Sequence, residues 1–234
     1  MSVDGAQRDA RSFAEWNEAM VLRYDIDRYY QDAHPIVRWI EERRLRALHR
    51  LAAPRAGERL LEVGVGGGHV LQRFAETRRI GIDLSATMLE RARRRLGPDV
   101  PLARADAEEL PFASASFDIV LCTEVLEHTR FPGRVLQELV RLCAPNGRII
   151  VSIPNEVIID RIKRELRRVP GLRRWLKVLA EEANEWHVHR FDLKAFKRVA
   201  ADTIDLVAVR GVPVNWLPVR YAVLGRAPGP LPKN

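Results

Sequence analysis

Cysteine is scarce in this sequence, and long apolar runs are absent. The two cysteines, Cys122 and Cys143, both lie inside apolar stretches of the 234-residue chain. They predict reduced thiols in a protein core and a cytoplasmic location, because one possible pair is no disulfide framework. No run approaches the roughly 18 consecutive apolar residues of a membrane-spanning helix. Residues 1–11 are polar and mixed in charge, so we expect no secretory signal.

Lysine is also scarce, and this changes how the net charge of +8 is interpreted. Of the 39 basic residues, 34 are arginine and 5 are lysine. A basic protein attracts nucleic acid and anionic membranes. An excess of arginine can equally reflect the base composition of a genome. The positions of charge clusters therefore carry more information than the total.

Apolar periodicity predicts an α/β fold in which strands and helices alternate. A helical segment over residues 13–51 ends at a break over 53–57. Strands are expected over 60–63, 80–82, 102–103, 117–122, 148–153, 204–209 and 219–224. Helices are expected over 69–76, 86–96, 132–142 and 193–201. This alternation indicates a mostly parallel seven-stranded sheet with helices on both faces.

The whole chain, residues 1–234, is expected to form a single domain with four parts. A helical collar covers residues 1–52, and the α/β core covers 53–154. A basic amphipathic insertion over 155–186 interrupts the alternation after the fifth strand. The last part, 187–234, holds a helix and two strands, which a hairpin-like turn over 211–218 connects.

The most informative motif is a glycine-rich turn directly after the first strand. It reads Glu62-Val63-Gly64-Val65-Gly66-Gly67-Gly68-His69. Glycines allow positive φ angles and let a ligand lie against bare backbone at a helix N-terminus. The G-x-G-x-x-G pattern of dinucleotide-binding proteins would need a glycine at His69. The acid at Glu62 suits an ammonium group better than a pyrophosphate.

From this turn onward the chain resembles the class I S-adenosylmethionine-dependent methyltransferases. The resemblance covers residues 55–155 in unbroken order and, more loosely, 186–226. Residues 81–85 resemble the acidic end of the family's second strand, and 105–112 resemble the segment that holds the adenine. Residues 116–122 match the fourth strand. Residues 143–148 resemble the Pro-Gly-Gly turn before the fifth strand, with Asn146 replacing one glycine; asparagine tolerates left-handed φ.

This resemblance implies S-adenosylmethionine as the cofactor and a Rossmann-like class I methyltransferase fold with an antiparallel last strand. Asp83 is expected to accept hydrogen bonds from both ribose hydroxyls, and Asp106 from the adenine amino group. Glu62 is expected to face the ammonium group. The complete expected cofactor-binding set is Glu62, Gly64, Gly66, Gly68, Asp83, Leu84, Asp106, Ala107 and Thr123. An NAD-dependent reductase would not need the Asp106 segment, and the sequence offers no hydride-transfer constellation.

A second polar motif follows the fourth strand, where the sheet edge meets the expected position of the methyl group. It reads Thr123-Glu124-Val125-Leu126-Glu127-His128. Glu124 and His128 are the candidate catalytic residues. In one interpretation the acid orients the cofactor and the histidine caps a helix. In the other, His128 is a general base, because its unperturbed pKa lies near neutrality.

The same motif is also a candidate metal site. On a helix, Glu124, Glu127 and His128 would share one face. Ubiquinone-pathway O-methyltransferases carry a similar Glu-x-x-Glu-His pattern. Small-RNA 2′-O-methyltransferases combine it with an earlier Pro-Asn and a later His-Lys-Phe-Glu segment, which residues 154–155 and 189–192 resemble. The resemblance implies that Mg²⁺ or another divalent cation is held by Glu124, Glu127, His128 and His189. In the alternative, His187 and His189 only pack or contact a lid.

The insertion is basic and amphipathic. Apolar residues keep helical spacing over 158–169 and again over 172–179, and residues 161–177 contain eight basic residues and one acid. This pattern fits an anionic membrane interface, and in the ubiquinone-pathway enzymes an insertion here is associated with membrane contact. A substrate lid with a solvated charged face fits equally.

The expected function is methyl transfer to an oxygen of a small or lipid-like acceptor. The enzyme is expected to be cytoplasmic, with peripheral membrane attachment left open. The alternative is an RNA 2′-O-methyltransferase whose arginines contact phosphates. The absence of an appended RNA-binding domain and the few aromatic residues for base stacking argue against it. The acceptor's identity and the oligomeric state are not predicted.

Overall fold

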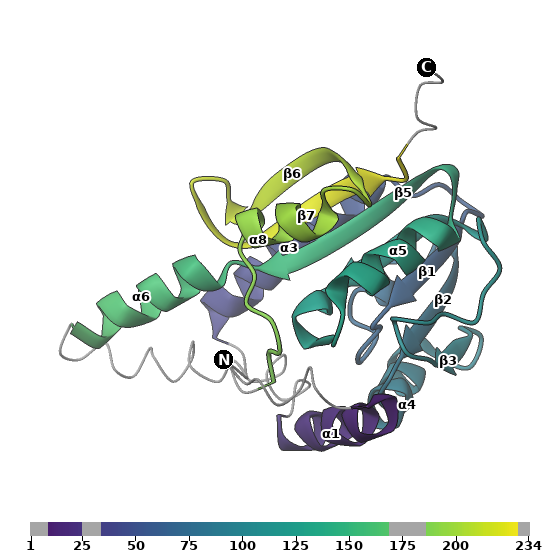
Figure 1. Ribbon diagram of the computed structural model, residues 1–234, viewed down its shortest axis with the longest axis horizontal. Coiled ribbons are helices and arrows are strands. Elements are labelled where there is room, and N and C mark those ends of the chain that lie inside the picture. Colours follow the sequence, from purple (N-terminus) through teal and green to yellow (C-terminus); the bar gives the residue numbers. More distant parts are fainter. Residues whose placement is uncertain (1–8, 25–33, 169–185, 229–234) are drawn as a thin grey trace.

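The computed structural model of the protein describes residues 9–24, 34–168 and 186–228. Within them, a seven-stranded sheet has the strand order β3-β2-β1-β4-β5-β7-β6 (Figure 1). Its members are β1 (Arg59–Val63), β2 (Arg78–Asp83), β3 (Leu102–Arg104), β4 (Phe117–Thr123), β5 (Cys143–Pro154), β6 (Asp205–Val214) and β7 (Leu217–Arg226). The first five strands pair in parallel, whereas β7 runs antiparallel to both β5 and β6. The predicted sheet and its antiparallel last strand are confirmed.

The helices are α1 (Ala10–Arg23), α3 (Pro35–Ala52), α4 (Ala86–Leu96), α5 (Pro132–Leu142), α6 (Glu156–Arg168) and α8 (Leu193–Ala200). Helices α4 and α5 have the predicted bounds. The start of α4 is fixed by the hydroxyl of Ser85, which accepts a hydrogen bond from the Met88 amide. Helix α6 confirms the first helical stretch of the predicted insertion, and the second, over 172–179, lies outside the described residues.

The prediction of a helix over residues 69–76 is wrong. The chain there forms only a short 3₁₀ turn, η1 (Leu71–Phe74). The guanidinium of Arg79 donates to the Leu71 carbonyl at 3.0 Å, and the Thr77 hydroxyl donates to the Phe74 carbonyl at 2.8 Å. These side chains satisfy the carbonyls that a further helical turn would have used.

The two faces of the sheet carry separate cores, because neighbouring residues of a strand point to opposite sides. Leu61 and Val63 pack on the side of α5 and α8. Leu60 packs with residues of α3 and α4 on the other side. Cys122 and Cys143 are buried and unpaired, as predicted. Among the described residues, no helix combines the length and apolarity needed to cross a membrane.

The ends of the parallel strands bring the predicted site residues to one edge of the sheet. The glycine-rich turn follows β1, Asp83 ends β2, and Thr123 ends β4. The two helices within the predicted collar, α1 and α3, pack against different parts of the fold. Helix α3 packs along β5, β6 and β7, while α1 lies against α4 at the site edge (Figure 1).

Candidate active site

The glycine-rich turn lets the chain pass closely under the loop that follows β4. Gly64 has a φ of 72°, in the left-handed region that favours glycine. A Cβ atom at Gly64 would lie 2.3 Å from Cγ2 of Val125. The close approach therefore requires glycine at this position, and it keeps bare backbone at the edge of a cavity that Gly64 and Gly66 line.

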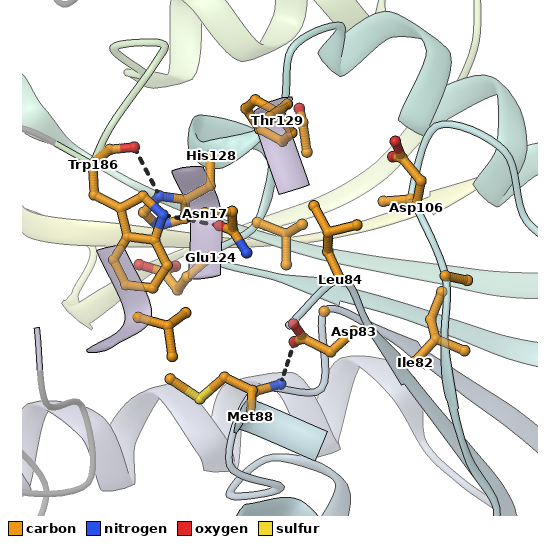
Figure 2. A pocket seen from close by; sticks show the side chains of 17 residues that line it. Asn17, Ile82, Asp83, Leu84, Met88, Asp106, Glu124, His128, Thr129 and Trp186 are labelled. Atoms are coloured by element: carbon orange, nitrogen blue, oxygen red, sulfur yellow. Dashed lines mark hydrogen bonds between the residues drawn. The ribbon is translucent and has the colours of Figure 1, made fainter. Parts of the chain in front are cut away.

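Asp83 connects the second strand to this turn. Its carboxylate accepts hydrogen bonds from the Gly66 amide at 2.8 Å and from the Ser85 amide at 2.9 Å. Asp83 lines the cavity together with Leu84 (Figure 2). Burial raises the pKa of the Asp83 carboxyl above its ordinary value, although the two amide hydrogen bonds oppose this shift.

Asp106 lies at the far end of the same cavity and is also held in place. One carboxylate oxygen accepts from the Glu108 amide at 2.9 Å, and the other accepts from the Arg130 guanidinium at 3.2 Å. Arg130 also pairs with Glu108 at 2.9 Å. Ala107 lines the cavity beside Asp106. The arrangement presents a fixed acceptor, which is what recognition of an amino group requires.

Glu62 is 1% exposed and belongs to the interior of the sheet edge. Its Oε1 atom accepts from the Thr123 hydroxyl at 3.4 Å, while Oε2 has no hydrogen-bond partner among the described residues. Burial raises the pKa of the Glu62 carboxyl to about 8. An ammonium group would satisfy the unpaired oxygen and favour the ionised form. The site therefore fits the amino-acid end of S-adenosylmethionine.

Six members of the predicted cofactor set line one cavity: Gly64, Gly66, Asp83, Leu84, Asp106 and Ala107. The other three have different surroundings. Glu62 and Thr123 bond to each other between adjacent strands, and Gly68 packs against Leu96 of α4.

Helix α1 forms a wall of this cavity, which the sequence motifs did not predict. Phe13, Asn17 and Val21 project from one face of α1 into it. Asn17 also accepts a hydrogen bond from the indole nitrogen of Trp186 at 3.1 Å (Figure 2). The spacing of four residues along α1 was the one available sign, but a packed helix shows the same spacing.

Glu124 lines the cavity but is fully engaged by other side chains. It has a left-handed φ of 56°, so it does not begin a helix. One carboxylate oxygen accepts from the Ser152 hydroxyl at 2.8 Å, and the other accepts from the Arg220 guanidinium at 2.9 Å. The shared helical face expected for Glu124, Glu127 and His128 is therefore not formed; only a 3₁₀ turn, η2 (Leu126–His128), follows.

His128 lines the cavity next to Trp186. Its Nδ1 atom lies 3.3 Å from the Trp186 carbonyl, and the two ring centres are 4.6 Å apart (Figure 2). Burial, followed by the neighbouring His187, lowers the pKa of the His128 imidazole to about 3. His128 is therefore neutral at physiological pH. It donates through Nδ1 and keeps a lone pair on Nε2.

Within the described residues, His187 joins Glu127 and His128 in a group whose ligand atoms lie within 4.8 Å of one another. Glu127 is 1% exposed, and its Oε2 atom has no hydrogen-bond partner there. Burial and the nearby Glu124 raise the pKa of the Glu127 carboxyl well above its ordinary value. The group combines an unsatisfied buried oxygen with two imidazoles.

The four predicted metal ligands do not meet at one point. His189 is turned away, since its Nε2 atom bonds the Arg130 carbonyl at 3.0 Å. Glu124 is bound to Ser152 and Arg220 instead. Two members of the predicted set, Glu127 and His128, do come together, and His187 occupies the place expected for His189.

Known proteins resemble the chain over the same regions. Residues 61–151 match a family model described as a methyltransferase domain. A ubiquinone biosynthesis O-methyltransferase of Thiobacillus denitrificans is 31% identical over 76% of this chain and 75% of its own length. The protein of that name from Hahella chejuensis is 33% identical, with coverages of 74% and 72%. The chain belongs to the class I S-adenosylmethionine-dependent methyltransferases.

The fold of this methyltransferase agrees with solved members. N-methyltransferase NodS from Bradyrhizobium japonicum, in complex with S-adenosyl-L-homocysteine, superposes with a TM-score of 0.66. The two share 18% identity, and the match covers 91% of this chain and 99% of NodS. The predicted family, enzyme class and methyl donor are confirmed. The individual cofactor ligands stay predictions, supported by the unpaired oxygen of Glu62 and the bare backbone at Gly64.

Proposed function

We propose that this enzyme transfers a methyl group to an oxygen atom of a small or lipid-like acceptor. Support comes from the two relatives named as O-methyltransferases of ubiquinone biosynthesis, which align with about three quarters of the chain. Phe13, Val21 and Met88 give the cavity an apolar wall that suits an acceptor with apolar surface. The RNA alternative has no support from these relatives, and we do not propose it.

One observation carries the proposal: His128 lines the same cavity as the cofactor-site acids Asp83 and Asp106. S-adenosylmethionine, when bound, supplies an activated methyl group. The displacement requires an acceptor oxygen held in line with the breaking bond and relieved of its proton. The task of the protein is therefore to orient the acceptor and to favour its deprotonated form.

The finer proposal is that Glu127, His128 and His187 hold a divalent cation. The unpaired Oε2 of Glu127 supplies an oxygen ligand, and neutral imidazoles supply nitrogen ligands. Such a mixed set suits Mn²⁺ and Zn²⁺ as well as Mg²⁺. A cation there would lower the pKa of an acceptor hydroxyl that contacts it. His128 alone is the second candidate, but a pKa of about 3 makes it a weak proton acceptor.

We also propose peripheral contact with an anionic membrane through the insertion. Helix α6 is amphipathic, and Arg161, Arg164 and Arg167 are exposed on it. Val157 at its start is 58% exposed. Basic and apolar side chains on one helix favour an interfacial position. A lipid-like acceptor would then be reached from the membrane surface.

The experiment follows a radiolabelled methyl group from S-adenosylmethionine into a bacterial extract. We expect the label in the organic-soluble small-molecule fraction and its release by reagents that cleave methyl ethers. His128→Ala should abolish transfer while retaining cofactor binding. The control, His189→Ala, should retain transfer because His189 bonds the Arg130 carbonyl. Label found in RNA or protein would contradict the proposed acceptor class.

A further inference from the structure

Glu156 is a buried carboxylate at the start of the insertion, next to the proposed cation site. It is the first residue of α6, directly after β5, and is 8% exposed. Its Oε1 atom lies 2.7 Å from Nδ1 of His187, and its Oε2 atom accepts from Nε of Arg190 at 2.9 Å. Each oxygen therefore has a separate partner. Glu156 belongs neither to the cavity lining nor to the proposed cation ligands.

The hydrogen bond from His187 decides which of its nitrogens carries the proton. An ionised carboxylate only accepts hydrogen bonds, so Nδ1 must carry a proton, and in the neutral imidazole the lone pair then lies on Nε2. The ring of His187 meets that of His128 edge-on, with centres 4.8 Å apart. Carboxylates that fix histidine ligands in this manner orient the ring and raise its basicity.

We propose that Glu156 is a positioning residue that holds His187 in the Nδ1-protonated form, which leaves Nε2 available as a cation ligand. This inference rests on the cation site proposed above. Arg190 supports this arrangement, because it pairs with Oε2 of Glu156 and leaves Oε1 of Glu156 to His187. Arg190 also pairs with Asp160, one helical turn further along α6. The start of the insertion is thereby connected to the cation site.

Glu156→Gln is a sharp test because it changes hydrogen-bonding character with little change in shape. Arg190 can only donate, so it should take the amide oxygen of the glutamine. The amide nitrogen then faces Nδ1 of His187 and requires that atom to accept. The imidazole should switch to the Nε2-protonated form, whose lone pair lies on Nδ1 and accepts from the amide, so that Nε2 can no longer bind a cation. Asp160→Asn is the matched control, since Asp160 also pairs with Arg190, whereas Nδ1 of His187 bonds Glu156 and not Asp160.

Two measurements on the folded full-length variants decide the matter. Titration with Mn²⁺ alone should show about a 10- to 100-fold weaker Kd for Glu156→Gln, and an unchanged Kd for Asp160→Asn. Nitrogen-15 NMR of the metal-free protein should show the switched form of His187 in Glu156→Gln only. Affinity for S-adenosylmethionine should be unchanged in both. If the glutamine variant does not fold, Glu156→Ala should show the same loss of Mn²⁺ affinity.

The outcomes separate the two proposals. Unchanged Mn²⁺ affinity and an unchanged His187 form in Glu156→Gln would overturn the role of Glu156. If the wild type binds no Mn²⁺, the proposed cation site is wrong. The NMR result then decides by itself: a switched His187 supports positioning by Glu156, and an unaltered one refutes it.

Discussion

The carboxylate of Asp83 holds the backbone amide of Gly66 at 2.8 Å, so the end of β2 fixes the glycine-rich turn that follows β1. Two consequences follow from this contact. The turn keeps its left-handed glycines in place, and the second carboxylate oxygen, which accepts from the Ser85 amide at 2.9 Å, fixes the start of α4. One side chain therefore orders two of the segments that line the cavity, the glycine-rich turn and the start of α4.

We expect Asp83→Ala to weaken S-adenosylmethionine binding by about 1–3 kcal/mol, because ribose hydroxyls and two amides lose their acceptor. Isothermal titration calorimetry measures the change. The control is Asp118→Ala, which removes an ion pair with Arg59 at the opposite edge of the sheet. That variant should lose some stability and keep its cofactor affinity. Equal affinity of Asp83→Ala and wild type would contradict the role given to Asp83.

A pair of glycine variants separates backbone strain from crowding. Gly57 and Gly64 have φ angles of 79° and 72°, but an added Cβ meets nothing within 4 Å at Gly57. Gly57→Ala should therefore cost about 1–2 kcal/mol, the penalty for left-handed alanine. Gly64→Ala should cost roughly 1–3 kcal/mol more, because its Cβ collides with Val125.

Urea unfolding of the two glycine variants gives both free energies of unfolding. Cofactor titration adds a second readout, since Gly64→Ala should lose binding and Gly57→Ala should retain it. Similar losses of stability in both variants would show that the contact with Val125 does not restrict this turn.

The sequence pattern predicted best those helices and strands whose ends depend on interactions between neighbouring residues. The predicted bounds of α4 agree with the structure, in which Ser85 caps the start of the helix and Gly97 ends it with a φ of 86°. Short apolar runs predicted the strands, but β5 begins at Cys143 and β6 ends at Val214, each about five residues beyond the predicted bound. The turn η1 was missed because its carbonyls are satisfied by Arg79 and Thr77, which lie beyond it in the chain.

The sequence predicted the site residues that lie at the ends of strands. It did not predict those whose positions depend on contacts between distant parts of the chain. His187 and His189 are two residues apart, and nothing local distinguishes them. The carbonyl of Glu127 accepts from the amides of Val188 and His189 at 2.8 Å and 3.1 Å. This pairing holds the segment so that His187 lies by His128 and His189 reaches the Arg130 carbonyl.

Membrane contact through the insertion predicts binding to anionic liposomes at low salt and release as salt screens the arginines. Replacing Trp175 and Leu176 with serine should weaken this binding and leave cofactor affinity unchanged. Trp216→Ser is the control, because Trp216 is 82% exposed on the β6–β7 hairpin, away from the insertion in sequence. Liposome sedimentation checks the result. A loss with Trp216→Ser alone would move the contact to the hairpin.

The raised pKa of Glu62 predicts that stability depends on pH and that cofactor binding is coupled to a proton. Its pKa rises from an ordinary value of 4.5 to about 8 on burial. At a pH between these two pKa values, Glu62 is deprotonated in the unfolded chain and protonated in the native protein. The free energy of unfolding therefore falls as pH rises through this window. Glu62→Gln keeps the shape and removes the titration, so this variant should melt at a higher temperature near pH 8 and show a flatter pH dependence.

The same substitution should abolish cofactor binding, because the ammonium group loses its carboxylate. In the wild type, an ammonium beside Glu62 favours the ionised form, so binding at pH 7 should release a proton. Calorimetry in two buffers of different ionisation enthalpy measures that release. Glu90→Gln, at an exposed carboxylate on α4, should leave melting, proton release and affinity unaltered. If wild-type binding released no proton, Glu62 would already be ionised in the free enzyme, and its unpaired oxygen would need another explanation.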